Sequence, residues 1–266
     1  MRKVIFVLLF CLILTQVCFA KVALVGSLSR ESEVKPGERI EGVFTLRNNG
    51  DKPEEVDLYQ KDYIFYADGR NDYIDPGSVK RSNANWISLS ANRIIVPPFD
   101  TVPVTYTIQI PNDPEIKGTY WSMIMVEPMG EPPTSIKHEP GKAKLGVRTM
   151  LRYGVQIITN IEDTGERKIK FLDKSIVTRD GKKYFKLDVE NIGERSLSPY
   201  IAMELYDNEG NIVGRYEGDK LRIYPGCSAS YMVELGDVPK GNYKSLILLD
   251  NKDEYVFGAQ YDLAIE

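Results

Sequence analysis

Apolar and polar residues alternate along many short stretches of the chain. In residues 185–190, Phe, Leu and Val are interleaved with Lys, Asp and Glu, and Ile40, Phe44 and Leu46 show the same spacing. A period of two places the apolar side chains on one face of a strand and the polar side chains on the other. Helix-period patterns are almost absent after Lys21. The pattern therefore predicts half-buried β-strands.

The predicted strands are short and are separated by turn signals such as Pro36-Gly37 and Asp180-Gly181. Besides the two stretches above, they span residues 22–27, 56–66, 86–89, 93–96, 102–110, 120–126, 145–159, 169–177, 200–206, 212–216, 228–235, 243–249 and 255–263. About seven strands make one immunoglobulin-like sandwich, so this count predicts an all-β protein with two such β-sandwiches in tandem. We place the first at residues 21–162 and the second at 166–266, on either side of a polar break.

A repeated phrase supports the tandem arrangement. One amphipathic strand ends in Asn48-Asn-Gly50, and another ends in Asn191-Ile-Gly193. Asn and Gly tolerate turn conformations that other residues avoid, so both phrases predict a turn after the strand.

The first 20 residues have the organisation of a secretory signal peptide. Arg2 and Lys3 precede an apolar run over residues 4–14, and Cys18-Phe-Ala20 provides small residues for cleavage. An uncleaved anchor is the alternative, but a membrane-spanning helix needs roughly 20 apolar residues. We expect an exported protein, in the periplasm or alternatively secreted or at the cell surface, that meets the membrane only through this cleaved segment.

The amino-acid composition excludes several kinds of binding site and covalent link. The 266 residues carry a net charge of −4, which argues against a dedicated nucleic-acid binder. His138 is the single histidine, so multi-histidine metal sites are excluded. Cys227 is the one cysteine beyond the signal segment, so a disulfide within the processed chain is excluded. No spacing of residues marks a nucleophile or a base, and we expect a non-enzymatic protein without cofactor or metal.

Three stretches carry a family resemblance. Residues 30–50 contain Lys-Pro-Gly-Glu and Leu-Arg-Asn-Asn-Gly, residues 85–98 place a Trp strand before a Pro-Pro turn, and residues 110–124 contain a proline turn and an aromatic strand. Together they resemble the first domain of bacterial pilus-chaperone-type sandwiches, and the layout is similar to that of WxL-interacting cell-surface proteins. The resemblance implies a chaperone-like or adaptor protein of the cell envelope that binds another exported or surface protein, as in pilus assembly.

The resemblance also implies a binding mode. In pilus chaperones the last strand of the first domain pairs with the client protein. Here that strand contains Leu145, Val147, Thr149 and Leu151 on one face. An exposed strand edge offers unpaired N–H and C=O groups, and alternate side chains supply selectivity. The alternative is that this apolar face fills the core of its own domain.

Pilus chaperones hold the client's terminal carboxylate with an arginine on the first strand and a lysine on the last. Aligned on Lys-Pro-Gly, this chain has Ser32 at the arginine position, with Arg30 two residues earlier. On the last strand, Arg148 and Arg152 flank the lysine position. We take Arg30, Arg148 and Arg152 as candidate carboxylate anchors, since a guanidinium binds a carboxylate through two bonds. The alternative is that they form a solvated strand face.

Two further hypotheses remain open. Trp86, Tyr120 and Trp121 can stack on sugar rings, which would make the protein a carbohydrate- or surface-binding structural module. Residues 68–75 gather Asp and Asn oxygens that can hold Ca²⁺, although a hairpin tip collects the same residues for its turn.

Overall fold

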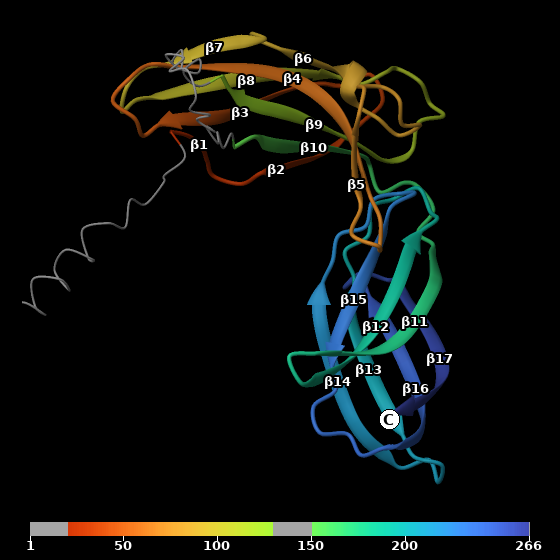
Figure 1. The fold of residues 1–266 in the computed structure, drawn as a ribbon. Coiled ribbons are helices and arrows are strands. Elements are labelled where there is room, and N and C mark those ends of the chain that lie inside the picture. The colour runs from red at the N-terminus through yellow and green to blue at the C-terminus, as the bar shows by residue number, and fades with distance from the viewer. Residues whose placement is uncertain (1–20, 130–150, 266) are drawn as a thin grey trace, which may run out of the picture.

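The computed structural model describes residues 21–129 and 151–265. Within these ranges the chain forms seventeen β-strands and one short 3₁₀ helix, η1 (Ala84–Trp86), and no α-helix. The predicted all-β fold class with two immunoglobulin-like sandwiches is confirmed. Figure 1 shows the two sandwiches as separate lobes, with their strands running in different directions.

The first domain consists of two sheets packed face to face. One sheet has the order β1 (Val22–Val25), β3 (Arg39–Asn48), β8 (Thr101–Gln109) and β6 (Ile87–Leu89). The other has the order β2 (Ser29–Val34), β10 (Tyr153–Ile161), β9 (Gly118–Pro128), β4 (Glu54–Phe65) and β5 (Asn71–Ile74), and β7 (Arg93–Val96) also pairs with β4. Alternate residues of both sheets, among them Phe44, Ile124 and Ile157, form the first core.

The first two strands, β1 and β2, belong to different sheets. β1 pairs antiparallel with β3 in one sheet, whereas β2 pairs parallel with β10 in the other. Gly26 lies between them with a φ of +94°, a conformation that glycine adopts without strain. The crossing therefore leaves β2 as the edge strand next to β10.

The second domain follows the same plan. A three-stranded sheet has the order β11 (Ile169–Arg179), β12 (Lys182–Asn191) and β15 (Ser228–Glu234). A four-stranded sheet has the order β14 (Ile212–Lys220), β13 (Tyr200–Tyr206), β16 (Gly241–Asp250) and β17 (Val256–Ile265). Phe185, Leu187 and Val189, the apolar half of the alternating stretch, are fully buried between the sheets.

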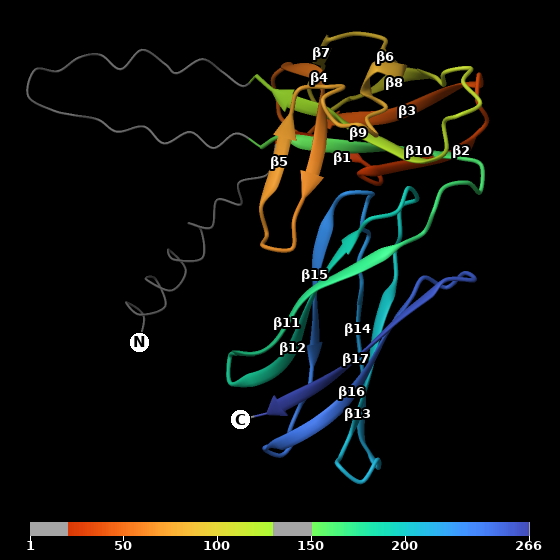
Figure 2. The ribbon, with the colours of Figure 1, turned by 90° about the vertical axis from the view of Figure 1, so that its right-hand side faces the viewer.

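The core of the second domain includes residues of the first. Trp121 and Ile158 belong to the same buried cluster as Phe185, and Ile64 and Phe65 pack against it. The β4–β5 hairpin reaches from the first domain to the second (Figure 2), where the Ala67 N–H donates to the Ser228 hydroxyl over 2.9 Å. The two domains therefore share an apolar interface.

The Asn-x-Gly phrase occurs in both domains for a reason other than the predicted turn conformation of its residues. Neither asparagine nor its glycine has a positive φ. Asn48 and Asn191 are instead fully buried, and each side-chain oxygen accepts the N–H of the glycine two residues later. Each amide donates to two carbonyl oxygens: Asn48 to those of Lys52 (2.7 Å) and Val96 (3.0 Å), and Asn191 to those of Arg195 and Ile223 (both 2.8 Å). The two side chains perform the same structural task in the two domains.

Two strands were not predicted. β2 has the sequence SRESEV and β5 the sequence NDYI, and within β2 only Val34 is buried. Both lie at the ends of the six-stranded sheet, where one side of the strand has no neighbour among the described strands. An edge strand with polar side chains has no alternating apolar signal, because little of it faces the core. Trp86, expected to begin a strand, ends η1 instead.

Candidate strand-docking edge

The edge of β10 is covered over only part of its length. β9 pairs with β10 from Tyr153 to Ile161, but β2 pairs with it only from Gln156 onward. The Gln156 N–H donates to the Leu28 carbonyl over 2.7 Å, and this is where the coverage starts. Among the described residues, no strand pairs with β10 on this side before Gln156.

The backbone groups of Gly154 face the uncovered side. Successive residues of a strand direct their N–H and C=O groups alternately to the two sides. Since the Gln156 N–H points toward β2, the corresponding groups of Gly154 point in the same direction, where β2 has not yet begun. Unpaired groups of this kind can form ladder hydrogen bonds with a strand of another chain.

The predicted docking residues fall mostly outside the described part of the chain. Leu145, Val147 and Thr149 lie outside the described residues, as does Arg148. Leu151 is described, and its residue is 52% exposed. It precedes β10 by two residues and does not fill the core of its own domain. The role of all four docking residues stays a prediction.

Arg30 lies at the point where the coverage of β10 begins. It is opposite Ile157 in the β2–β10 pairing, on the face that turns toward the first core. Its guanidinium donates to the Ser27 carbonyl over 2.6 Å. The cation is thus held against the turn between β1 and β2, next to the uncovered part of β10.

Arg152 lies on the other face of the same sheet. Its guanidinium is 3.8 Å from the carboxylate of Glu127, whose Oε2 accepts the Tyr59 hydroxyl over 2.7 Å. A hydrogen bond with Tyr59 and the charge of Glu127 raise the pKa of Arg152. Because Arg30 and Arg152 stand on opposite faces, the structure does not bring these two candidate anchors together.

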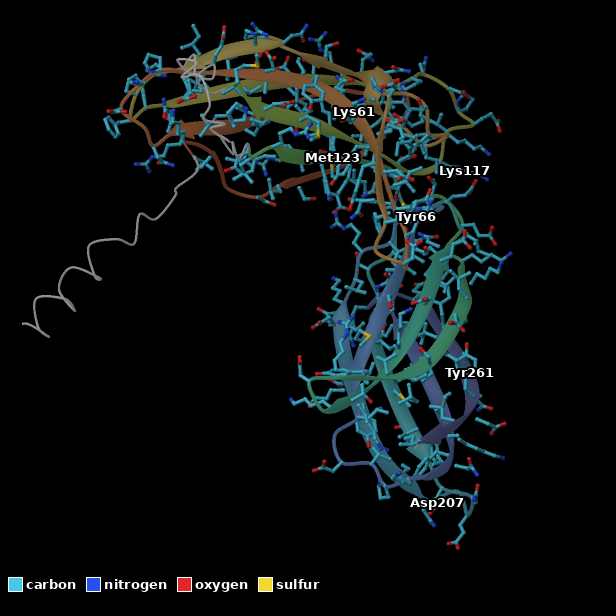
Figure 3. All side chains as sticks on the ribbon, in the orientation of Figure 1. Lys61, Tyr66, Lys117, Met123, Asp207 and Tyr261 are labelled. Atoms are coloured by element: carbon cyan, nitrogen blue, oxygen red, sulfur yellow. The ribbon has the colours of Figure 1, made fainter. Side chains whose placement is uncertain are left out.

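Methionine side chains lie beside the uncovered edge. Met123 and Met125 are on the outer face of β9, opposite Gln156 and Gly154 of β10. A Cβ placed on Gly154 would come within 2.7 Å of the Met123 Sδ, so the thioether lies directly over the glycine. Figure 3 labels Met123 on the first domain and Tyr66 at the tip of the hairpin that meets the second. Sequence reasoning missed this pair of methionines because both faces of β9 are buried, so its sequence does not alternate between apolar and polar residues.

The β11 edge of the second domain is less suited to docking. Lys174 of β11 faces inward opposite Leu187 of β12, and its ammonium lies 4.6 Å from the ring centre of Tyr261 on β17. A register shift also interrupts β11 between Phe171 and Asp173. An inward-pointing charge and a bulge are common protections against edge-to-edge pairing.

The aromatic residues proposed to bind sugars do not form an exposed platform. Trp121 is 2% exposed, because it is enclosed between the two domains. Trp86 and Tyr120 contact each other, with ring centres 4.5 Å apart, and pack against the first core. The hypothesis that Trp121 stacks on a sugar ring is therefore wrong.

The acidic residues 68–75, which were considered as a Ca²⁺ site, are engaged in contacts with the β4–β5 hairpin itself. Asp68 accepts the Arg70 N–H over 2.9 Å, and Asp75 pairs with Lys61 at 2.8 Å. In residues 21–129 and 151–265, no group of three or more His, Cys, Asp or Glu side chains is arranged to hold a metal ion. Nor does this part of the chain contain a helix with the length and apolarity needed to cross a membrane.

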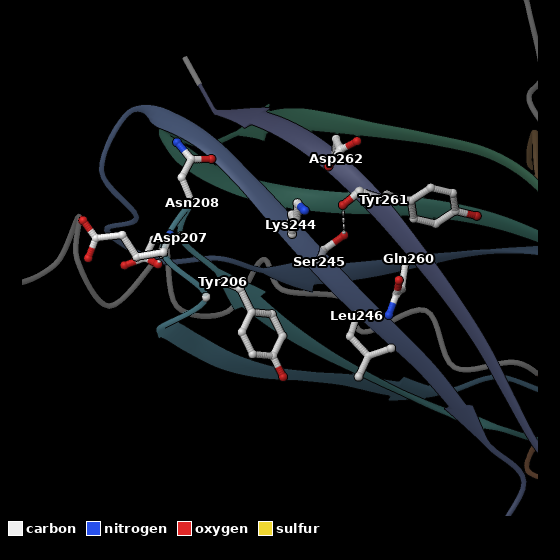
Figure 4. Close-up of a pocket in the computed structure, with 11 residues that line it drawn as sticks. Tyr206, Asp207, Asn208, Lys244, Ser245, Leu246, Gln260, Tyr261 and Asp262 are labelled. Carbon is white, nitrogen blue, oxygen red and sulfur yellow. Dashed lines mark hydrogen bonds between the residues drawn. The ribbon is translucent and has the colours of Figure 1, made fainter.

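The second domain carries an open groove of about 590 Å³ on the outer face of its four-stranded sheet (Figure 4). Tyr206 and Leu246 line it together with polar side chains that include Lys244 and Gln260. At one end, Asp207 accepts backbone N–H groups of its own turn. The groove lies on the other domain from β10 and contains no nucleophile paired with a base.

Comparison with known proteins agrees with this architecture. No family model and no curated protein sequence matches the chain. Among solved structures, a chain from a chaperone–tip adhesin complex of CFA/I fimbriae is similar, with a TM-score of 0.51, 12% identity, and coverage of 91% of this chain and 98% of that one. The protein has the fold of a fimbrial chaperone.

Two further solved structures are similar over comparable shares of both chains. The class 5 fimbriae chaperone CfaA has a TM-score of 0.48 at 14% identity, over 90% of this chain and 98% of that chain. The Escherichia coli chaperone DraB has a TM-score of 0.42 at 13% identity, over 92% and 96%. The structure from the CFA/I fimbriae complex confirms, at the level of the fold, the predicted resemblance to pilus chaperones.

Proposed function

We propose that the protein is a non-enzymatic periplasmic chaperone that binds an exported subunit by pairing one of its strands with β10. The uncovered edge at Gly154 is the observation that carries the proposal. An extended segment of the client would hydrogen-bond to the groups that face away from β9. It would meet β2 end to end, because β2 occupies the same side from Gln156 onward.

Met123 and Met125 would contact the side chains of that segment on the outer face of the sheet. Methionine is unbranched and polarizable, so it adapts to side chains of different shapes. Leu151, exposed just before β10, would add apolar contact at the other end of the segment. This combination suits a client strand with alternating apolar residues.

Arg30 is the better placed of the two described anchor candidates. Its guanidinium lies at the turn where β2 begins, and a client strand running parallel to β10 would end there. Its present acceptors are backbone carbonyls, which a carboxylate can replace with a stronger charge-assisted bond. Arg152, in contrast, is already beside Glu127.

Two substitutions of Gly154 provide the test. Gly154→Pro removes the N–H that faces the uncovered side and leaves the groups of residues 153 and 155, which face β9, unchanged. Gly154→Ala adds a Cβ near Met123 but keeps the N–H, so it is the matched control. Both variants and the wild type would be tagged and used to capture proteins from the envelope fraction.

We expect the wild type and Gly154→Ala to retain one or more exported proteins, and Gly154→Pro to lose them. Circular dichroism checks that both variants remain folded. Equal capture by all three folded proteins would exclude the β10 edge as the docking site. Failure of the wild type to retain any exported protein would count against a chaperone role.

A further inference from the structure

β17 is a long edge strand of the second domain. It spans ten residues, Val256–Ile265, and pairs with β16 along its whole length without a register shift. Among the described strands, none pairs with its other side, which runs along the margin of the second lobe (Figure 1). Its sequence, VFGAQYDLAI, contains no proline, lysine or arginine, and its one charged residue is Asp262. Exposed edge strands are usually protected by such residues or by bulges, so β17 lacks the usual protection.

The other edges of the second domain differ from β17. β14 lies against β15 of the opposite sheet, where a Cβ placed on Gly218 would be 3.2 Å from the Met232 carbonyl oxygen. β11 has the register shift and the inward-pointing Lys174 described above. Between β11 and β17 the sandwich is open, and a hollow of about 450 Å³ there is lined by Ile176 and Leu263. β17 is therefore a regular edge on the open side of its domain.

The backbone groups of every second residue of β17 face this open side. Just before the strand, the Asn251 N–H donates to the Tyr255 carbonyl over 3.2 Å. Hydrogen-bonded pairs recur at every second position of an antiparallel ladder, so the odd-numbered residues from 257 to 263 exchange their bonds with β16. The N–H and C=O groups of Gln260 and Asp262 therefore point away from β16. They can form a ladder with another strand.

The inner face of β17 is complementary to itself. When Gln260 lies opposite Gln260 of a second copy in an antiparallel pair, Tyr261 lies opposite Ala259 and Phe257 lies opposite Leu263. Residues that are opposite each other share one face of the sheet and contact each other. The bulky Tyr261 ring thus meets the smallest side chain of this face. Because Phe257, Ala259 and Tyr261 are only partly buried in one copy, the pairing would remove more of their surface from water.

The same register separates the charges. Asp262 lies opposite Gly258 of the second copy, so the two carboxylates are about 13 Å apart along the strand. A ladder centred on Tyr261 would instead place two Tyr261 rings opposite each other, each with the Lys174 ammonium 4.6 Å from its centre. A ladder centred on Asp262 would oppose two carboxylates, which is destabilising. The side chains therefore favour a ladder centred on Gln260.

We propose that β17 is a homodimer interface, in which two copies of the chain pair antiparallel around a two-fold axis at Gln260. A second copy is the occupant because the same residues supply both sides of the interface, and each of them meets a complementary residue. The two four-stranded sheets would form one continuous sheet. The β10 edge lies on the other domain, so each copy keeps it for a client, and the dimer does not depend on the proposed chaperone function.

Sedimentation velocity of the purified protein over about a hundredfold range of concentration measures the self-association. Gln260→Pro removes the N–H at the centre of the ladder, and Gln260→Ala, which keeps this N–H, is the matched control. Proline is tolerated on an edge strand where the N–H faces outward, and circular dichroism checks that the variants are folded.

Two cysteine variants test the register. In Gln260→Cys the two opposite Cα atoms would be about 5.5 Å apart, which permits a disulfide. Val256→Cys is the control, because Val256 lies opposite Ala264 and far from its own copy. The native Cys227 is fully buried and does not compete.

We expect the wild type and Gln260→Ala to form dimers as the concentration rises. Gln260→Pro should raise the dissociation constant about tenfold or more, because it removes two central hydrogen bonds. Under mild oxidation Gln260→Cys should form a covalent dimer and Val256→Cys should not, and this comparison decides if Gln260→Pro does not fold. A wild type that is monomeric throughout would overturn the proposal, as would equal crosslinking at both positions or a dimer unchanged by Gln260→Pro. Gly154→Pro should leave the dimer intact, which separates this interface from the proposed strand docking.

Discussion

The indole of Trp121 stacks on the phenol ring of Tyr224, with ring centres 4.8 Å apart and planes inclined by 12°, although the two residues belong to different domains. The indole N–H donates to the Tyr63 carbonyl over 2.7 Å, and the Tyr224 hydroxyl donates to Gln156 over 2.7 Å. This stack fixes the second domain against the sheet that contains β10. The interface between the domains therefore combines apolar packing with hydrogen bonds that fix its geometry.

Trp121→Ala should destabilise the protein by about 3–5 kcal/mol, because it removes a large buried side chain and leaves a cavity between the domains. Guanidinium unfolding followed by circular dichroism measures the loss. Tyr73→Ala is the control, since Tyr73 is 52% exposed and should cost far less. A similar midpoint for both variants would mean that the stacking contributes little to stability.

The two buried asparagines should be equally important. Asn48→Ala and Asn191→Ala each leave two carbonyl oxygens and one N–H without their side-chain partner. We expect a loss of about 2–4 kcal/mol for each. Asn49→Ala, one residue later in the first phrase, should change the unfolding midpoint much less. If Asn48→Ala matches Asn49→Ala, the buried amide is not what requires asparagine here.

Glu194 should make the domain interface sensitive to acid. It lies 3.0 Å from Arg81 and 3.2 Å from Lys117, both of the first domain. Burial alone would raise the pKa of Glu194, but the Glu166 N–H and these two cations lower it below its ordinary value. A lowered pKa stabilises the fold above the unfolded-state pKa near 4.5, and this contribution is lost as the pH falls through the folded-state pKa.

Thermal melts of the wild type and Glu194→Gln between pH 7 and pH 3 check this. The wild type should be the more stable at pH 7, and the difference between the two should shrink as the pH falls below about 4.5. Glu209→Gln, in an exposed turn of the second domain, is the control. A constant difference across the range would show that the charge of Glu194 does not stabilise the interface.

Cys227 should be unreactive in the folded protein. It is fully buried, as expected for a small apolar residue, and burial raises the pKa of its thiol to about 11. At pH 8 the thiolate fraction is then only about one in a thousand, and the reagent has no access. Iodoacetamide should therefore modify the chain 21–266 only in denaturant. Rapid modification under native conditions would contradict this burial.

Alternation alone predicted much of the fold. The apolar residues of the stretches around Phe44 and Phe185 form the buried faces of β3 and β12. A strand with one apolar face removes that face from water by packing it against a second sheet. The Asn-x-Gly phrases were correctly read as strand ends, but for the wrong reason. A sequence shows that asparagine is present, whereas its burial and its bonds to Val96 and Ile223 depend on residues far along the chain.

The candidate site was accessible to sequence reasoning only in part. Arg30 and Arg152 were identified from the resemblance to pilus chaperones, but their separation onto two faces follows from the register of β2 and β10, which joins residues more than 120 positions apart. The uncovered edge at Gly154 likewise exists because the polar strand β2 begins at Ser29 and not earlier. What the chain determined locally was which faces are apolar. Tertiary packing decided which strand edges stay unpaired. It also decided that Trp121 is enclosed between the two domains. Both features depend on neighbouring residues that no local sequence pattern specifies.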